Sequence, residues 1–382
     1  MIGRSKKLFR KFLIICNIAI VVVYLLSCLA PSLHAGKFWF IALLGLGFHA
    51  LFILVLAALI CMAIMRSKWV FLPLASLVLS WQQVSVAFGI HTKTFTNTKQ
   101  EGTLRVLSWN VSFWDEGNRD SNGGWSFRDS MMKLVQTQNA DILCFQEFFE
   151  SRDAKYYAMN IPALEEMGFA YHYFFPTLSR HGGKFQNGVV ILSKFPMVDS
   201  AQFIYDENSA AERLISADIK VGDQTFRVLT THLQSVMFNT QDYQGLNEIK
   251  HTGNKAIDAT KNIVAKLRKG YNFRSGQAEM VRRYINESPF PVIVCGDFND
   301  VPNSYAYFTV KGDLQDAFLK AGYGLSRTFR FISPTLRIDY IFADKTFKVN
   351  QYARLKVPYS DHYPIVADLS YERTADSRLT GR

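Results

Sequence analysis

Polar side chains follow a short apolar stretch in the C-terminal half of this sequence. Residues 291–295, PVIVC, predict a buried strand, and Gly296, Asp297 and Asn299 follow it closely. Glycine, aspartate and asparagine are also common in surface turns, so this stretch alone fits a bare turn. Strand ends on a rigid sheet are, however, good positions for catalytic groups. Asp297 and Asn299 are two residues apart, so in an extended chain they face the same side.

The pattern recurs along the chain, because other predicted strands also end in, or contain, polar side chains. These are Asn110 after VLSW, Glu147 after ILCFQ, His232 after VLTT, Asp339 within RIDYIF, and Asp361 and His362 before YPIV. A polar group that is buried without a partner destabilises a fold, so one shared polar site would explain the recurrence. Carboxylates, amides and imidazoles in one site can together bind a divalent cation and transfer protons.

The elements that position these residues are mostly strands. Strands are predicted in TLRVLSWNVS, ADILCFQEF, GVVILSKFPMV, RLISADIKV, TFRVLTTHL, PFPVIVCGD, RIDYIFAD, FKVNQYARLKV and HYPIVADLSY. Helices are predicted at residues 126–139, which begin with a capping pattern at Ser126, and over most of residues 243–287. Many strands with few helices between them favour mixed sheets packed together, with helices outside.

Seven pieces of the sequence resemble, in order, the endonuclease/exonuclease/phosphatase superfamily, which includes deoxyribonuclease I, abasic-site endonucleases, neutral sphingomyelinases, inositol-polyphosphate 5-phosphatases and deadenylases. The pieces are SWN, QE, NGVVILSKFP, THL, GDFN, IDYIF and SDHYP, and they cover about residues 103–370. The resemblance implies a four-layered α/β sandwich of two mixed β-sheets flanked by helices, with the site between the sheet edges. It also implies Mg²⁺-dependent cleavage of a phosphate ester.

The resemblance implies a metal site at the ends of two strands. Glu147 is the expected Mg²⁺ ligand, Asn110 stands beside it, and Mn²⁺ is a possible substitute for Mg²⁺. Asp361 either ligates the metal or fixes the turn that carries His362.

The remaining matched residues are expected to transfer protons and orient the reactants. His362 is the expected general base, and Asp339 holds its ring and stabilises the imidazolium. Asp297 and Asn299 orient the water and the phosphate, although Asp297 could also take the water's proton. His232 is expected to donate to a phosphate oxygen or to the leaving oxygen.

Two departures from the abasic-site endonucleases bear on the substrate. Those enzymes usually have an acidic residue where this chain has Ser112, and a Tyr motif where it has THL. The sphingomyelinase and deoxyribonuclease branches carry the histidine, so a DNA-repair role is disfavoured. Asn187 is either a phosphate contact or a turn residue before Gly188, and Arg337 fits a salt-bridge partner on the strand of Asp339.

The N-terminal quarter has the composition of a membrane region. Residues 1–90 contain no Asp or Glu, and apolar runs cover residues 12–30, 38–65 and 69–90. Each run is long enough to cross about 30 Å of hydrocarbon as a helix, which predicts about three transmembrane helices. A cleavable signal peptide would explain only the first run. The third run, which contains Pro73, also fits a re-entrant or interfacial helix.

Basic residues predict the orientation in the membrane. Five of them precede the first run, Arg66 and Lys68 separate the second from the third, and only Lys37 separates the first from the second. The positive-inside rule then places the N-terminus in the cytoplasm. Three spans would put the rest of the chain on the non-cytoplasmic side, whereas two would keep it inside.

Four segments follow from these patterns. They are a transmembrane region (1–90), a polar linker (91–102), a catalytic domain (103–372) and a tail (373–382). The five cysteines have no paired spacing, so neither a disulfide framework nor a zinc site is predicted. Residues 91–382 hold 35 basic and 32 acidic residues, which is not the charge balance of a nucleic-acid-binding face.

Three classes of function fit the sequence. The favoured one is a membrane-anchored phosphodiesterase or phosphatase acting on a lipid head group or another membrane-proximal ester. The alternatives are a membrane-tethered nuclease acting on DNA or RNA, and a non-catalytic transmembrane interaction protein. The retained acids and histidines disfavour the last class. Seven basic residues between Lys250 and Arg274 form either a solvated helix face or a lid that grips anionic head groups or nucleic acid.

Overall fold

A computed structural model describes residues 2–92, 94–119, 121–205, 211–248 and 254–371 of the chain. The chain forms two compact units, and each is built from separated segments. The first unit comprises Met1–Phe88, Val236–Gly276 and Asp300–Thr309. The second comprises Gly89–Ser235, Gln277–Asn299 and Val310–Arg382. The predicted tail, residues 373–382, lies outside the described residues.

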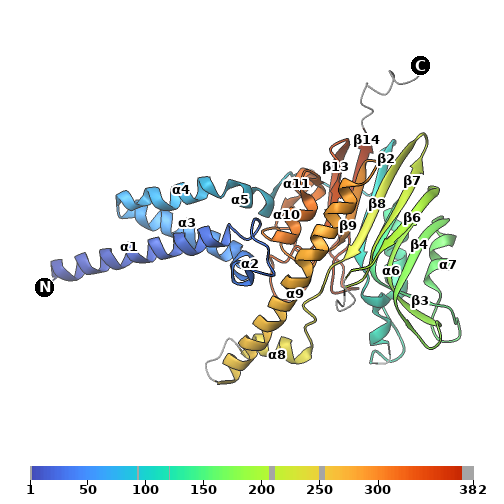
Figure 1. The fold of residues 1–382 in the computed structure, drawn as a ribbon, viewed down its shortest axis with the longest axis horizontal. Helices are drawn as coiled ribbons and strands as arrows, with labels where there is room; N and C mark the ends of the chain where they lie inside the picture. The colour runs from blue at the N-terminus through green and yellow to red at the C-terminus, as the bar shows by residue number, and fades with distance from the viewer. Residues whose placement is uncertain (1, 93, 120, 206–210, 249–253, 372–382) are drawn as a thin grey trace, which may run out of the picture. The chain divides into compact units, whose positions relative to one another are not determined.

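Helices make up the first unit (Figure 1). They are α1 (Ile2–Ser27), α2 (Trp39–Leu46), α3 (Phe48–Ile64), η1 (Lys68–Val70), α4 (Phe71–Leu79), α5 (Trp81–Ala87), α8 (Thr240–Glu248), and the parts of α9 (Asn254–Asn286) and α10 (Tyr305–Lys311) that fall within its segments. Residues 5–27 of α1 are long and apolar enough to cross a membrane. Phe12, Ile15 and Val22 on this helix are at least half exposed, which suits a helix surrounded by lipid.

The second and third apolar runs are both bent, whereas the sequence predicted that each is long enough to cross as a helix and left a re-entrant or interfacial helix open only for the third. Helices α2 and α3 meet at 66° around Gly47, and the pair formed by residues 68–79 and 81–87 meets at 63° around Ser80. Glycine favours a helix break at the first bend. At the second bend the Ser80 hydroxyl hydrogen-bonds the Leu77 carbonyl and the Tyr24 hydroxyl, and serine bonds of this kind to a backbone carbonyl often bend a helix. Among the residues that the structure describes, one helix could therefore span a membrane, or up to three if each bent pair is one span.

Part of the basic segment packs within the first unit. Tyr271 of α9 is buried with Ala35 and Ala42, and the Ser275 hydroxyl accepts from the Gly36 N–H at 3.2 Å. Arg274 is buried beside Asp300, at 3.3 Å from Nε to Oδ2. This end of the segment is therefore neither a solvated face nor a free lid. Lys250 lies outside the described residues.

The second unit contains two six-stranded mixed sheets and one two-stranded ribbon. The strands are β1 (Gly89–Ile90), β2 (Thr103–Asn110), β3 (Ile142–Ser151), β4 (Tyr171–Arg180), β5 (Phe185–Ser193), β6 (Met197–Phe203), β7 (Leu214–Val221), β8 (Gln224–His232), β9 (Val292–Asp297), β10 (Gln315–Asp316), β11 (Tyr323–Gly324), β12 (Asp339–Ala343), β13 (Phe347–Arg354) and β14 (Ile365–Tyr371). The strand orders are β13-β14-β2-β3-β5-β4 and β10-β12-β9-β8-β7-β6. In each large sheet one pair is parallel, β2 with β3 and β8 with β9, and the others are antiparallel.

Apolar side chains from both sheets form the central core of this unit. Val106 and Ile142 from one sheet are buried with Ile215 and Ile293 from the other. The outer face of the first sheet is covered by η2 (Ser112–Asn118), α6 (Arg128–Gln138) and α7 (Asn160–Glu166), as Figure 1 shows for α6 and α7. Helix α11 (Ala317–Ala321) packs into the central core at Phe318. The predicted α/β sandwich of two mixed sheets is confirmed.

The segment predicted as a linker belongs to the second unit and contacts the rest of that unit. The carbonyl of Asn97 accepts from Arg105 Nη1 at 2.7 Å. The Lys99 ammonium lies 2.6 Å from an oxygen of Asp141. These contacts hold the segment against the sheet that contains β2.

Candidate active site

Strand pairing brings the predicted polar residues to one edge of the two sheets. In one sheet, Asn110 at the end of β2 is paired with Gln146 of β3, one residue before Glu147. In the other, His232 at the end of β8 is paired with Asp297 at the end of β9, and Asp297 is paired with Asp339 at the start of β12. Because parallel strands end at the same edge, the three acids and the histidine gather there.

A β-bulge directs Glu147 into this site. One extra residue lies on β3 between Phe145 and Phe148, and Glu147 has a left-handed backbone with φ of 49°. The preceding Gln146 donates to the Thr230 hydroxyl at 2.9 Å, which links the two sheets beneath the site. Bulges reorient side chains in this way next to functional sites.

The end of β9 and the turn that follows it form part of the site. Gly296 has φ of 152°, and a Cβ there would lie 2.1 Å from the Thr231 carbonyl oxygen, so only glycine fits. The Asn299 N–H donates to Asp297 Oδ1 at 2.8 Å, and the Asn299 side chain donates to the Leu233 carbonyl at 3.0 Å. This network leaves Asp297 Oδ2 directed at its neighbours in the site.

The Asn110 amide joins two of the acids. Its Nδ2 donates to Glu147 Oε1 and to Asp297 Oδ2, each at 3.1 Å. Its Oδ1 accepts from the Ser112 N–H at 3.0 Å, which fixes the orientation of the amide. Burial raises the pKa of Glu147 to about 7, and the neighbouring charges of Asp361 and Glu212 also raise it, while His232 lowers it.

His362 and Asp339 form a buried pair beside Asp297. The ring Nδ1 donates to Asp339 Oδ2 at 2.9 Å, and Nε2 lies 3.5 Å from Asp297 Oδ2. Burial lowers the pKa of His362, but the charges of Asp339 and Asp297 outweigh it and hold that pKa well above the usual histidine range. Burial raises the pKa of Asp339, and the adjacent His362 partly offsets this.

Three further side chains hold the pair in place. The Trp109 indole donates to the His362 carbonyl at 3.0 Å, and the Ser360 hydroxyl accepts from the His362 N–H at 3.1 Å. The Thr328 hydroxyl oxygen accepts from the Asp339 N–H at 3.1 Å. Sequence reasoning did not identify Thr328, because a threonine in a loop carries no distinguishing pattern.

His232 forms a second pair, with Glu212, which sequence reasoning also missed. His232 Nδ1 lies 3.2 Å from Glu212 Oε2, and its Nε2 lies 3.5 Å from Asp297 Oδ2. Glu212 also accepts from the Glu147 N–H at 2.8 Å. Burial lowers the pKa of His232, but the bond to Glu212 and the charge of Asp297 outweigh it and raise that pKa to about 9. The available signal was an acidic residue directly before the predicted strand RLISADIKV.

The other candidates fall in different places. Asp361 is half-buried, lies close enough to affect the charges of Glu147 and His362, and accepts from Ser360 at 3.1 Å. Arg337 pairs with buried Asp316 at 2.7 Å, which is the salt-bridge role expected from the sequence.

Asn187 lines a cavity of about 430 Å³ together with aromatic and basic side chains. Phe113, Phe149, Tyr157, Arg180 and His181 are among the others. Phe149 is two residues beyond Glu147 on β3, so this cavity adjoins the strand that carries the metal-ligand candidate.

The donor set fits a hard divalent cation. Single ligand atoms of Asp297, Asp339 and His362 lie within 4.8 Å of one another. The Asn110 amide nitrogen holds one oxygen of Glu147 and one of Asp297 close together, and carboxylate oxygens are ligands that Mg²⁺ prefers. A cation would also stabilise the charged form of Glu147 against its burial, which is the main cause of its raised pKa, and against the charges of Asp361 and Glu212.

The family model for the endonuclease/exonuclease/phosphatase family matches residues 107–362. The chain belongs to this family. The matched region begins in β2 and ends at His362, so it contains every residue of the cluster described above. A domain family of unknown function, DUF8431, matches residues 10–87.

Solved structures of endonuclease/exonuclease/phosphatase proteins are similar to this chain at low identity. A protein of this family from Beutenbergia cavernae is 19% identical over 71% of this chain and 72% of its own, with a TM-score of 0.49. The human Nocturnin catalytic domain with bound sulfate is 20% identical over 72% and 96%, with a TM-score of 0.48. A mannosyl-6-phosphatase of Bacteroides thetaiotaomicron is 21% identical over 70% and 100%, with a TM-score of 0.46. Comparison with curated proteins found no match.

Membership of the endonuclease/exonuclease/phosphatase family gives the chain the fold of phosphoesterases and nucleases. Within that fold, the cluster combines carboxylates suited to a cation with two histidine–carboxylate pairs. Such an arrangement can bind a phosphate group, polarise it and transfer protons on either side of it.

Proposed function

We propose that the protein is a membrane-anchored, Mg²⁺-dependent phosphoesterase that hydrolyses a phosphodiester or phosphomonoester at the membrane. The observation that carries the proposal is the convergence on Asp297. Its Oδ2 lies 3.1 Å from the Asn110 amide and 3.5 Å from Nε2 of both His362 and His232. A structural salt bridge would need only one of these partners.

Glu147 and Asn110, with Asp361, would hold the cation, which supplies charge neutralisation on the phosphate oxygens. Asp297 and Asn299 orient the attacking water. The water oxygen forms a bond to phosphorus while the bond from phosphorus to the leaving oxygen breaks. The proton of the water passes to His362 Nε2 or to Asp297 Oδ2, which face the same position.

His232 assists from the other side of Asp297. Glu212 holds its Nδ1, so Nε2 can donate to a phosphate oxygen or to the leaving oxygen. The carboxylate of Glu212 stabilises the protonated ring, as the raised pKa of His232 indicates. The two histidines thus supply a base and an acid for one displacement.

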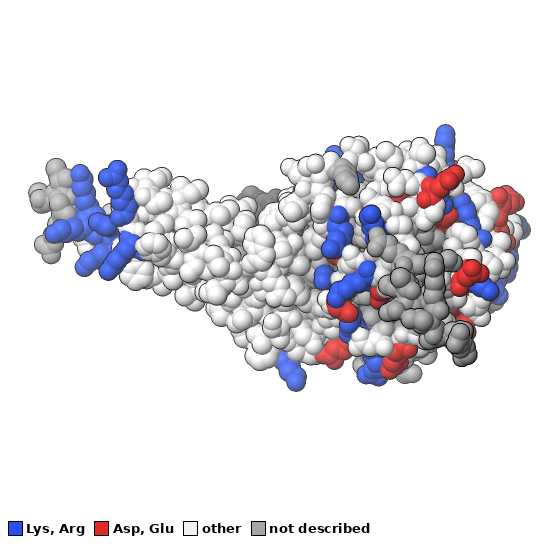
Figure 2. Space-filling model, turned by 90° about the horizontal axis from the view of Figure 1, so that it is seen from above, with Lys and Arg blue, Asp and Glu red and all other residues white. Residues whose placement is uncertain are grey.

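The N-terminal helices support a membrane-bound substrate. Helix α1 carries no charged residue after Lys11, and Figure 2 shows basic side chains gathered at the N-terminal end, with an uncharged surface along the following turns. An anchored enzyme meets a membrane-bound ester at a high effective concentration, whereas the anchor adds nothing for a freely diffusing one. The modest net charge of residues 91–382 is also unlike that of a nuclease, which gains affinity from many phosphate contacts.

The test compares substrates and surroundings with the full-length chain, because the second unit is not one continuous segment. Phospholipids, sphingolipids, inositol phosphates and single- and double-stranded nucleic acids are offered with Mg²⁺, in liposomes and in detergent. Liposomes should accelerate cleavage of a lipid ester and leave a soluble chromogenic phosphodiester unaffected. Strong cleavage of DNA or RNA with none of any lipid would replace the proposal with a membrane-tethered nuclease.

The side of the membrane has its own test. With the basic N-terminus in the cytoplasm and three spans, the second unit lies on the non-cytoplasmic side. A reporter fused after Arg382 should then behave as exported. A cytoplasmic signal would mean an even number of spans, and it would bring intracellular nucleic acids back as substrates.

A further inference from the structure

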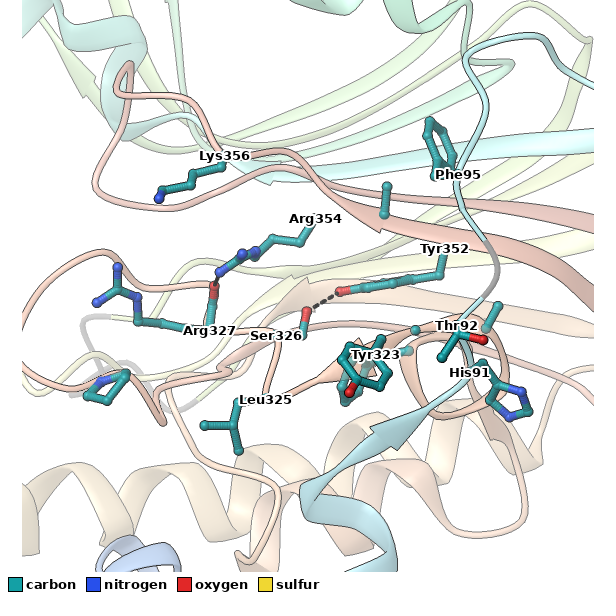
Figure 3. A pocket seen from close by; sticks show the side chains of 15 residues that line it. His91, Thr92, Phe95, Tyr323, Leu325, Ser326, Arg327, Tyr352, Arg354 and Lys356 are labelled. Carbon is teal, nitrogen blue, oxygen red and sulfur yellow. Dashed lines mark hydrogen bonds between the residues drawn. The ribbon is translucent and has the colours of Figure 1, made fainter.

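A second cavity opens in the second unit and contains none of the catalytic side chains. Its volume is about 790 Å³, within the range of sites that bind small organic ligands. Four parts of the described chain line it: His91, Thr92 and Phe95, helix α11 at Phe318 and Ala321, the loop that contains Leu325 and Arg327, and the end of β13 with its continuation (Figure 3).

One side of this cavity is cationic. Figure 3 shows Arg327, Arg354 and Lys356 on the same side, and no acidic residue is among those that line the cavity. Within the described part of the chain, none of the three pairs with a carboxylate, unlike buried Arg105 with Asp368. Three uncompensated cations in one cavity attract an anion with several oxygens.

The two arginines are held in place without a counter-ion. Arg354 Nη1 donates to the Arg327 carbonyl at 2.8 Å. Both guanidinium groups lie over the Tyr363 ring, at 5.1 Å for Arg354 and 6.0 Å for Arg327. Burial raises the pKa of Tyr363, but Arg327 and Arg330 outweigh it and lower that pKa, which reports the same positive potential. The guanidinium donors are therefore pre-positioned and fully charged.

The opposite side of the cavity is apolar and aromatic. Phe95, Tyr323 and Tyr352 lie there in Figure 3, and the Tyr352 hydroxyl is 3.2 Å from that of Ser326. A ligand that fills both sides needs an anionic group joined to an apolar body. In the sequence, His91 and Thr92 of this cavity follow β1 directly, and β1 begins two residues after the apolar helix α5 ends.

The two loops that carry the cations also carry catalytic residues. Arg327 is followed by Thr328, which holds the backbone of Asp339, and by Phe329, whose ring lies 5.1 Å from that of His362. Arg354 ends β13, and Lys356 and His362 lie in the connection from β13 to β14. The Tyr363 N–H joins the two loops by donating to the Thr328 carbonyl at 2.8 Å.

We propose that this cavity is a second, non-catalytic site for a phosphate ester with an apolar body. The phosphate lies between Arg327, Arg354 and Lys356, and the apolar part packs against Tyr323 and Tyr352. A bound phosphate crosslinks the two loops and so restrains the positions of Asp339 and His362. A membrane phospholipid and a soluble phosphorylated metabolite share this chemistry.

The test uses the full-length chain in a non-ionic detergent, with EDTA present so that no probe is hydrolysed. The probes are dihexanoyl phosphatidic acid, inorganic phosphate, and dihexanoylglycerol, which lacks the phosphate. Affinity is measured by calorimetry, and amide hydrogen exchange locates the binding. Phosphatidic acid should slow exchange in residues 94–97, 323–327 and 352–356, which line or flank the cavity.

Two charge reversals and a matched control decide the result. Lys356→Glu and Arg327→Glu should each weaken phosphatidic acid about tenfold or more, since each removes a charge-assisted contact. Lys348→Glu makes the same charge change on β13 outside the cavity and should have less than about a twofold effect. Lys356 and Lys348 are both exposed, so neither substitution threatens the fold.

The probes also distinguish the two sources of ligand. Phosphatidic acid binding at least about tenfold tighter than inorganic phosphate supports the site with a lipid as its ligand. Equal affinity for the two supports the site with a soluble phosphate as its ligand. Binding that is insensitive to both charge reversals, binding of dihexanoylglycerol as tight as that of phosphatidic acid, or no protection in the cavity segments overturns the proposal. None of these results depends on the reaction at the catalytic cluster.

Discussion

The two histidine–carboxylate pairs of the site reach the same oxygen from different sides. In each pair Nε2 of the histidine lies 3.5 Å from Asp297 Oδ2. Asp339 contacts the His362 ring with both of its oxygens, at 2.9 and 3.1 Å. Glu212 contacts His232 with one oxygen at 3.2 Å and uses the same oxygen to accept from the Glu147 N–H.

The two carboxylates bond their histidines differently, which indicates different roles in the reaction. Asp339 bonds the His362 ring with both of its oxygens, and its N–H donates to the Thr328 hydroxyl. Asp339 therefore holds the His362 ring tightly. Glu212 also holds the backbone of Glu147, so the second pair is coupled to the metal-ligand candidate. We therefore expect the first pair to matter more for the attacking water, and the second for the charge of the phosphate and the leaving oxygen.

Removing the metal should produce the largest effect, because both pairs act on a phosphate that the cation neutralises. We expect a chelator to reduce the rate about 10⁴-fold or more, and Mg²⁺ or Mn²⁺ to restore it. Glu147→Gln should lose most of the activity, measured on a soluble chromogenic phosphodiester. Full activity in EDTA would show that the reaction needs no metal. The two histidine–carboxylate pairs would then have to account for catalysis without a cation.

The first pair should come next. His362→Ala and Asp339→Asn should each lower kcat about 10³-fold, and the double variant should be little worse than the worse single one. The reason is that Asp339 acts through the ring it orients. Multiplicative losses in the double variant would show that the two residues act independently.

The second pair should have a smaller effect. His232→Ala and Glu212→Gln should each lower kcat about 10²-fold, and combining His232→Ala with His362→Ala should multiply the two losses. His172→Ala is a matched control, because His172 also pairs with a carboxylate: its Nδ1 lies 3.2 Å from Glu165 Oε1. This pair is half-exposed and is not part of the cluster. If His232→Ala lowers kcat no more than His172→Ala does, the second pair has no catalytic role.

The pH profile gives the smallest and most specific difference. If His232 acts protonated, activity falls as the pH rises through its pKa of about 9. Glu212→Gln removes a carboxylate that favours the protonated ring, so the alkaline limb of kcat/KM should move to lower pH. His362 acting as a base should instead define the acidic limb, which Asp339→Asn should move to lower pH. Interchanged responses of the two limbs would exchange the roles of the pairs.

The sequence predicted the location of the site better than its internal contacts. Strand ends in order along the chain were enough to place Asn110, His232 and Asp297 at one edge, because parallel pairing fixes which ends meet. Glu212 was missed because it precedes a strand instead of ending one. It reaches His232 through the antiparallel register that pairs Leu214 with Thr231.

The helical part was predicted by length and composition but not by shape. Hydropathy identifies apolar runs, yet it does not show that Ser80 bonds Tyr24 and Leu77 at a bend. The packing of Tyr271 against Ala35 and Ala42 joins residues more than 200 positions apart, so no local pattern could reveal it.

The bulge at Glu147 makes chain length, and not only composition, a determinant of activity. Phe145 and Phe148 both lie in the outer core of their sheet because one extra residue separates them. Losing a single codon at position 147 would restore the two-residue alternation and keep both phenylalanines buried. Given the proposed metal-binding role of Glu147, this one in-frame deletion should give a folded but inactive protein without any change in the core.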